Sequence, residues 1–442
     1  MTASNASGDG RRNRNADRKG FASQTDAVSS LTPEADEELV TRKGLMIAAA
    51  ACLAVIVSHI FGRSTYSLLL PAISDELVSS YGAAGFLGAS YFGGYLLGVI
   101  GVTVFSSRIE PIVLMRTGLA ISVLALATMA TAQRFSVFSS GIFFVGLAGA
   151  GIWIPAPTIA SSRVPARYRG LVIGALTATM GIGLLGLSQG TKLYRHLAGN
   201  DQLWREIFGI EVAVTTAILV FVVAVVRRDG VRDRLAAAVP TSSLPNGASS
   251  AWFSLEEVKS IPHWVRLTLA YTVFALLAGA WVQFLGVVLS DDAGFSQGHI
   301  ANLFSVLAVA AIIGPLSLGQ LSDRIGRDRA MAIAATMSAV ASLLLPLDRE
   351  PFTSVAVFLY GAGSFAFPPL TAAAVRDHLE GSRFSRAFGT MTILYAIISM
   401  IASQAAGLLA DATGDFDLVY LLLAAAAFGS VAAALSRQRA LG

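Results

Sequence analysis

The chain has 442 residues, of which 54% are hydrophobic and only 14% are charged, whereas soluble globular domains carry about 25% charged residues. The charges gather between apolar stretches long enough to cross a bilayer core, which takes about 20 helical residues. This composition excludes a soluble globular protein and predicts an all-α membrane protein. The net charge of +4 fits the lysine and arginine excess of cytoplasmic loops, so no nucleic-acid partner is expected.

A polar segment, residues 1–43, precedes the first apolar stretch and has no apolar periodicity, so we expect a disordered tail. From residue 44 the pattern predicts twelve transmembrane helices. The predicted spans cover residues 44–70, 82–104, 111–132, 136–160, 170–190, 206–226, 264–289, 298–318, 328–346, 352–374, 387–410 and 417–435. Residues 436–442 form a second short tail.

The lysines and arginines are distributed unevenly over the predicted loops. Of 32, 26 fall in the tails and loops on the side of the N-terminus and five on the opposite side, and Arg63 falls inside a span. Positive charge collects on the cytoplasmic side of membrane proteins. Both termini are therefore predicted to be cytoplasmic.

The central loop, residues 227–263, is the longest internal break between spans. Near its end, Ser254 is followed by two glutamates, which is typical of a helix start. The apolar residues of this short helix are expected on the membrane surface; they are Leu255, Val258 and Ile261. The alternative is a plain linker with one surface helix.

The central loop separates two groups of six spans, residues 44–226 and 264–435. Span 4 contains GAGIWIPAP (149–157), and span 10, its counterpart, contains GAGSFAFPP (361–369). Two glycines, an aromatic residue and a proline match at an offset of 212 residues. The repeat predicts two pseudo-symmetric six-helix bundles with a binding site between them near mid-membrane.

A compact charged stretch, GQLSDRIGRDR (319–329), lies in the predicted loop between spans 8 and 9. It resembles the loop signature of the major facilitator superfamily, Gly-x-Leu-x-Asp-Arg-x-Gly-Arg-x-Arg. The resemblance implies an alternating-access transporter whose two halves are clasped by this loop on the cytoplasmic side, with the Asp323 carboxylate meeting span 5 near residues 167–170. The alternative, a topology signal alone, would not require the aspartate or the glycines. The gating residues would be Gly319, Asp323, Arg324, Gly326 and Arg327.

Within the superfamily, residues 61–77 and 91–98 resemble the YbfB/YjiJ-type branch. In span 5 the glycine-rich run is similar to the antiporter signature of the superfamily, but it lacks a Gly-Pro pair. That departure weighs against a drug–proton antiporter.

Arg63 predicts a binding site, because a charge at membrane depth is costly and usually functional. Its guanidinium would attract an anionic group such as a carboxylate. Alternatively, the side chain reaches the outer headgroups. His59 and Tyr66 have i, i+4, i+7 spacing with Arg63 and are predicted to share its helical face.

Other polar and aromatic residues inside the spans are further candidates for contact with a substrate, although each could instead serve helix packing. They are Tyr91, Tyr95, Trp153, Trp281, Gln283, Asn302, Tyr360 and Tyr395. Trp153 lies beside two prolines, which predict a bent or broken span 4.

No aspartate or glutamate falls in the middle of a span. Proton coupling needs a titratable group in the pathway, so His59, or else Glu211 near the outer face, is the predicted proton carrier. An uncoupled facilitator is the alternative.

The sequence thus predicts a secondary or facilitative transporter that moves a small organic solute, favouring an anion, across the plasma membrane. Proton-driven efflux of a drug or metabolite, or a non-transporting sensor, are alternatives. Five scattered histidines do not form an enzyme or metal site, and no phosphate-binding loop motif occurs. We expect a monomer without a cofactor.

Overall fold

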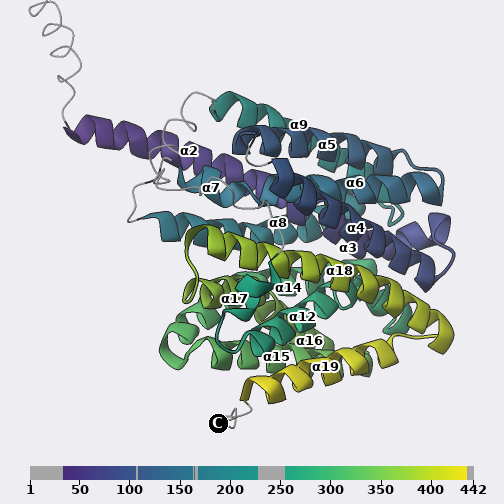
Figure 1. Ribbon diagram of the computed structural model, residues 1–442. Coiled ribbons are helices and arrows are strands. Elements are labelled where there is room, and N and C mark those ends of the chain that lie inside the picture. Colours follow the sequence, from purple (N-terminus) through teal and green to yellow (C-terminus); the bar gives the residue numbers. More distant parts are fainter. Residues whose placement is uncertain (1–32, 106–107, 163, 165–167, 227–253, 436–442) are drawn as a thin grey trace, which may run out of the picture.

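The computed structural model describes residues 33–105, 108–162, 164, 168–226 and 254–435, and these contain helices and no strand. The helices form two groups, one above the other in Figure 1, which correspond to the two predicted halves. The N-terminal half comprises α2 (Pro33–His59), α3 (Arg63–Leu77), α4 (Tyr81–Phe105), α5 (Pro111–Ala130), α6 (Phe135–Trp153), α7 (Ala156–Ser161), α8 (Arg169–Ala198) and α9 (Trp204–Val225). The C-terminal half comprises α12 (Trp264–Ala280), α13 (Leu285–Val287), the π-helix η3 (Val288–Asp292), α14 (Gln297–Ile325), α15 (Arg327–Leu344), the 3₁₀-helix η4 (Leu345–Leu347), α16 (Phe352–Ser364), α17 (Phe367–Arg376), α18 (Gly381–Thr413) and α19 (Asp417–Leu435).

The all-α membrane architecture is confirmed. Within the described residues, nine helices are long and apolar enough to cross a membrane, or ten if the bent pair of α12 with α13–η3 is one span. Helix α19 is a shorter apolar helix. The total of twelve spans and the cytoplasmic side of both termini stay predictions. Helix α2 begins at Pro33, ahead of residue 44; residues 1–32 of the predicted tail and residues 436–442 lie outside the described residues.

Four spans are broken, and the breaks occur in corresponding helices of the two halves. Spans 1 and 7 are interrupted at residues 60–62 and 281–284, and spans 4 and 10 at residues 154–155 and 365–366. The predicted break in span 4 is confirmed. The predicted span 1 lies within one apolar span, Arg42–Leu77, but the sequence did not indicate its break: Gly62 has φ +76°, a left-handed conformation that glycine adopts without strain. Breaks in transporter helices commonly border the binding site.

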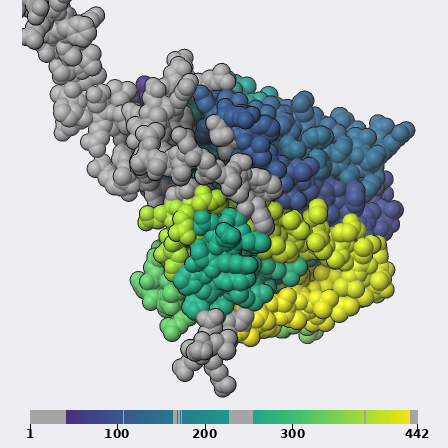
Figure 2. Space-filling model, viewed as in Figure 1, coloured from purple at the N-terminus to yellow at the C-terminus, as the bar shows by residue number. Residues whose placement is uncertain are grey.

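The buried apolar residues form a large core shared by both halves, a small shared core, and two cores that each belong to a single half. The large shared core joins α3 and α4 with α13, η3, α14 and the end of α18, at the end of the molecule that is predicted to be external. The small shared core lies between α4, α6 and α18 and consists of Tyr95, Val99, Ala150, Ile393 and Ala396. Of the other two, one lies within the N-terminal half and one within the C-terminal half, both toward the predicted cytoplasmic end. In the space-filling view the purple and yellow surfaces of the two halves touch at the right-hand end (Figure 2).

Helices α4 and α6 pack with their backbones in close contact, as the glycines of span 2 suggest. A Cβ atom on Gly94 would lie 1.9 Å from the carbonyl oxygen of Phe143, and one on Gly146 would lie 2.0 Å from that of Tyr91. This packing fixes Tyr91 against α6 and so helps to position the central site.

The short helix α11 (Leu255–Lys259) belongs to the C-terminal half. Ser254 begins it by accepting a hydrogen bond from the Glu257 amide at 3.3 Å, which confirms the predicted helix start. Val258 and Ile261 were expected on the membrane surface. They are 4% and 3% exposed instead, because they pack into the core of the C-terminal half; Leu255 is exposed.

Glu257 anchors this segment to the start of α18. Its carboxylate binds Arg386 at 2.7 Å and Arg383 at 2.8 Å. The guanidinium groups of Arg386 and Arg383 hold the pKa of the Glu257 carboxyl below its usual value. The stabilisation is therefore present at neutral pH and is lost as the pH falls through the lowered pKa.

We expect Glu257→Gln to lower the free energy of unfolding by about 1 kcal/mol or less at neutral pH, with a melting temperature lower by about 2 °C. The difference from wild type should shrink as the pH falls through the lowered pKa of Glu257 and vanish in more acidic solution, where the wild-type carboxyl is also neutral. Thermal unfolding of the detergent-solubilised protein over a pH series measures both. Glu256→Gln, at an exposed neighbour, is the control and should match wild type throughout; a defect of Glu257→Gln that persists in acid would refute the ion-pair interpretation.

Candidate functional site

Arg63 lies at the first residue of α3, directly after the break in span 1. Its guanidinium donates a hydrogen bond from Nη2 to the carbonyl oxygen of Ala278 at 2.9 Å. Ala278 belongs to α12 of the other half, so Arg63 bridges the two halves between their broken spans. The side chain is only half-buried.

Aromatic rings surround the Arg63 guanidinium. Its carbon Cζ lies 4.9 Å from the ring centre of Phe92 and 5.4 Å from that of Tyr91, distances at which cations interact with aromatic faces. Tyr395 and Tyr360 are close electrostatic neighbours from the C-terminal half. The structure therefore brings three of the predicted candidates, Tyr91, Tyr395 and Tyr360, together with Arg63 at one place.

Trp281 completes the wall on the side of Tyr360. Its ring stacks on the Tyr360 ring at 3.8 Å with an interplanar angle of 6°. The Tyr360 hydroxyl donates to the carbonyl oxygen of Leu277 at 3.2 Å, beside the break in span 7. Tyr395 is half-buried and stacks on Phe274 at 5.0 Å.

Arg63 makes no ion pair within the part of the chain that the structure describes. A guanidinium at membrane depth normally pairs with a carboxylate or faces a water-filled cavity. This site thus presents a fixed positive charge, lined by aromatic rings from both halves, for which the described residues supply no counter-ion.

His59 and Trp153 form a pair beside the site, at the two breaks of the N-terminal half. Their ring centres are 4.5 Å apart, edge to face, and the Nδ1 atom of His59 hydrogen-bonds with the Ser58 hydroxyl at 2.7 Å. Because the helix is broken between His59 and Arg63, these residues and Tyr66 do not lie on one continuous helical face.

Tyr95 is also an electrostatic neighbour of Arg63, Tyr91 and Tyr395, and it packs with Ile393 and Ala396 of α18. Three other predicted contact residues have partners elsewhere. Tyr66 donates to the carbonyl oxygen of Ala84 at 3.0 Å, and the Gln283 amide packs where a side chain on Gly88 would be. The third is Asn302, whose Oδ1 accepts from Lys192 at 2.8 Å. These contacts serve helix packing in this conformation.

Glu211, on α9, binds the other face of the break in span 1. It is 3% exposed. Its Oε2 accepts a hydrogen bond from the Gly62 amide at 3.2 Å, and its Oε1 accepts one from the Thr65 hydroxyl. The carboxylate thus caps the N-terminus of α3, where backbone donors and the helix dipole favour a negative charge.

The predicted gating loop is built as a turn between α14 and α15. Gly326 has φ +92°, as the predicted tight turn requires. Asp323 is 67% exposed and pairs with Arg327 of its own loop at 2.6 Å, and Arg327 also binds Asp377 at the end of α17 at 3.1 Å. Arg324 is exposed.

The expected clasp between Asp323 and span 5 is not among the contacts of this conformation. Residues 165–167 of the expected partner lie outside the described residues, and Asp323 bonds within its own half. A Cβ atom on Gly319 would have nothing within 4 Å, so no neighbouring helix of the described chain packs closely at this glycine. The physical reason is that the halves share their core at the opposite end.

At the predicted external end, a different carboxylate joins the halves. Asp411, near the end of α18, accepts hydrogen bonds from the backbone amides of Tyr81 and Gly82, both at 2.8 Å. These amides begin α4, so this too is a carboxylate at a helix N-terminus. Next to it, the Gln404 amide donates to the Gly82 carbonyl oxygen at 3.2 Å.

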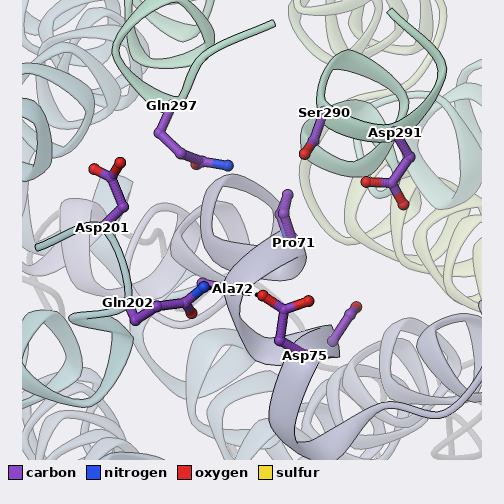
Figure 3. Close-up of a pocket in the computed structure, with 9 residues that line it drawn as sticks. Pro71, Ala72, Asp75, Asp201, Gln202, Ser290, Asp291 and Gln297 are labelled. Atoms are coloured by element: carbon purple, nitrogen blue, oxygen red, sulfur yellow. Dashed lines mark hydrogen bonds between the residues drawn. The ribbon is translucent and has the colours of Figure 1, made fainter. Parts of the chain in front are cut away.

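Beside this contact, a small polar pocket of about 150 Å³ opens between the halves. Figure 3 shows Asp75, Asp201 and Asp291 around it, with Gln202 donating to Asp75 at 2.9 Å. Three carboxylates at this end repel anions, so the pocket itself does not suit an anionic solute.

Sequence reasoning missed Phe92, the Ala278 carbonyl and the role of Asp411. Phe92 follows Tyr91 directly, but its ring carries no polar group that marks it as a site residue. A backbone carbonyl such as that of Ala278 leaves no signal in the sequence.

Comparison with known proteins finds a matching family, two partial relatives and a structure of the same fold. The sequence model of the Major Facilitator Superfamily matches residues 52–347 and 267–440. Monocarboxylate transporter 12-B of Danio rerio is 28% identical over 191 residues, 41% of this chain and 40% of that protein. The gentisate transporter of Corynebacterium glutamicum is 30% identical over 162 residues, 36% of this chain and 33% of that protein. The crystal structure of the nucleoside transporter NupG shares the fold, with a TM-score of 0.69 at 13% identity, over 89% of this chain and 100% of that one.

Proposed function

Because this chain belongs to the Major Facilitator Superfamily and is a multi-pass membrane transporter of a small solute, we propose that its solute is an organic carboxylate. Arg63 binds the carboxylate in this proposal, and the aromatic rings around it contact the organic part. The transporter acts as a monomer in the plasma membrane. The membership in the YbfB/YjiJ-type branch stays a prediction.

One observation carries the proposal: Arg63 is a guanidinium between the two halves that has no ion-pair partner among the described residues. A carboxylate solute would supply the missing counter-ion through charge-assisted hydrogen bonds. Tyr91, Phe92 and Tyr395 offer apolar ring surface beside it, which favours a carboxylate that carries a ring. Two relatives that match part of this chain, a monocarboxylate and a gentisate transporter, agree with an organic anion.

We further propose that the structure is the conformation with the external side closed. The halves share an apolar core and the Asp411 contact at that end, and they have separate cores at the other. In alternating access the external contacts would break and the cytoplasmic loop would then clasp the halves through Asp323.

Uptake into proteoliposomes tests the solute class. We expect saturable uptake of radiolabelled benzoate, slower uptake of lactate, and no uptake of benzamide, the neutral isostere of benzoate. Uridine is the control for a neutral, ring-bearing solute. Uptake of benzamide or uridine at the rate of benzoate would show that the charge is not recognised and would exclude the proposed solute class.

A further inference from the structure

The break in span 1 carries two charged groups, one on each side. Arg63 faces the central site, while Glu211 binds Gly62, directly before Arg63, and Thr65, two residues after it. We propose that Glu211 is a proton-binding site linked to anion binding at Arg63. The inference rests on the proposed function, and it selects Glu211 over His59 as the proton carrier.

The described groups that face Glu211 leave its charge without a cation partner. On α2, His59 contacts Trp153 and Ser58. On α3, the Arg63 guanidinium contacts the rings of Tyr91 and Phe92. On the other neighbouring helices, Tyr194 lines the same cavity as Glu211. The basic residues there bind other groups: Lys192 binds Asn302, Arg195 binds Gln297, Arg205 binds Glu76, and Arg116 binds the Val226 carbonyl oxygen. A buried carboxylate without a cation is costly when ionised, so a proton is the ligand that suits it.

A cavity of about 460 Å³ between α2, α8 and α9 reaches Glu211. Thr191 lines this cavity, is 2% exposed, and has no hydrogen-bond partner for its hydroxyl oxygen within the described part of the chain. Thr215, one helical turn beyond Glu211, is also fully buried with an unpartnered hydroxyl. Thr191, Tyr194 and Glu211 are the polar side chains that line this otherwise apolar cavity, and a water molecule bound among them would give a proton a path to Glu211.

The sign of the linkage follows from the charges. The negative charge of Glu211 at the start of α3 opposes a second negative charge beside Arg63. Protonation removes that opposition, so proton and anion favour each other's binding, and by reciprocity anion binding takes up a proton. Ionised Glu211 also holds the Gly62 amide and Thr65 hydroxyl more strongly than the neutral acid does. Protonation therefore loosens the break at the residue that binds the anion.

Benzoate binding to the purified, full-length protein tests this linkage. We expect wild type to bind benzoate about five- to 100-fold more tightly in mildly acidic than in mildly alkaline solution, and to take up protons from a lightly buffered solution as it binds. Glu211→Gln, which is permanently neutral, should bind benzoate at both pH values as tightly as wild type does in acid, with no proton uptake. Glu211→Asp should restore the pH dependence.

Two matched variants separate this role from a structural one. Glu206→Gln, on an exposed position of the same helix, and His59→Gln should both keep the wild-type pH dependence. Loss of the dependence in His59→Gln, or its persistence in Glu211→Gln, overturns the inference while the proposed function stands. Absence of benzoate binding to wild type at both pH values overturns the inference together with the carboxylate proposal.

Discussion

Replacement of Arg63 by glutamine should abolish anion binding while leaving the protein folded. Removal of one partner from a buried, hydrogen-bonded charge pair costs about 2–5 kcal/mol of binding free energy, which is a loss of affinity of about 30-fold or more. Benzoate binding by titration calorimetry and benzoate uptake by proteoliposomes should fall together. Arg63→Lys keeps the charge without the planar fork and should fall between wild type and Arg63→Gln.

The thermal stability of the ligand-free Arg63→Gln protein distinguishes a binding role from a packing role. Arg63 has no ion-pair partner in the described part of the chain, so its removal should leave the melting temperature unchanged or raised. Arg205→Gln is the matched control, since Arg205 pairs with Glu76 at the predicted external end at 2.5 Å; it should keep benzoate binding. Equal benzoate affinity in Arg63→Gln and wild type would contradict the site.

The second large effect is expected at Asp411, where asparagine should open the external side. The carboxylate accepts hydrogen bonds from two α4 amides at 2.8 Å each, but an asparagine oxygen can serve only one of them well and has no charge for the helix N-terminus. Asp411 is exposed, so we expect about 1 kcal/mol, or about fivefold more of the externally open state.

A single cysteine at the external pocket measures that opening. Ser290 lines the pocket in Figure 3, and Cys52 is the one native cysteine. In a Cys52→Ala, Ser290→Cys background, Asp411→Asn should increase the rate of labelling by a membrane-impermeant maleimide about fivefold. Asp415→Asn is the control, because Asp415 accepts from the Asp417 amide within one half. An unchanged labelling rate in Asp411→Asn would show that this carboxylate does not hold the halves together.

The sequence predicted the features that depend on long apolar patterns and on single residues whose burial in a membrane is costly. The order of helices follows the apolar periodicity, and the repeat at 149–157 and 361–369 predicted a correspondence that the paired breaks of spans 4 and 10 bear out. Arg63 is conspicuous because a guanidinium in an apolar run needs a reason. The three tyrosines that the structure gathers around it were each predicted individually.

The features that could not be predicted depend on which conformation the halves adopt and on contacts through the backbone. Asp323 and Asp411 are both carboxylates at helix ends, and the sequence does not say which of them faces a partner in this state. Asn302 and Gln283 look like site residues inside spans, yet each fills a helix interface. The break before Arg63 depends on a positive φ at Gly62, one glycine among 42.

The shared external core also makes the transport cycle sensitive to temperature. Opening the external side brings buried rings such as Trp281, Phe284 and Phe416 toward water, and hydration of apolar surface raises the heat capacity. Since apolar association weakens on cooling, cold should favour the open form at this end more than at the other, where each half retains its own core. The rates of the two directions of the cycle should thus curve differently with temperature. This asymmetry arises from the placement of apolar side chains rather than from the solute.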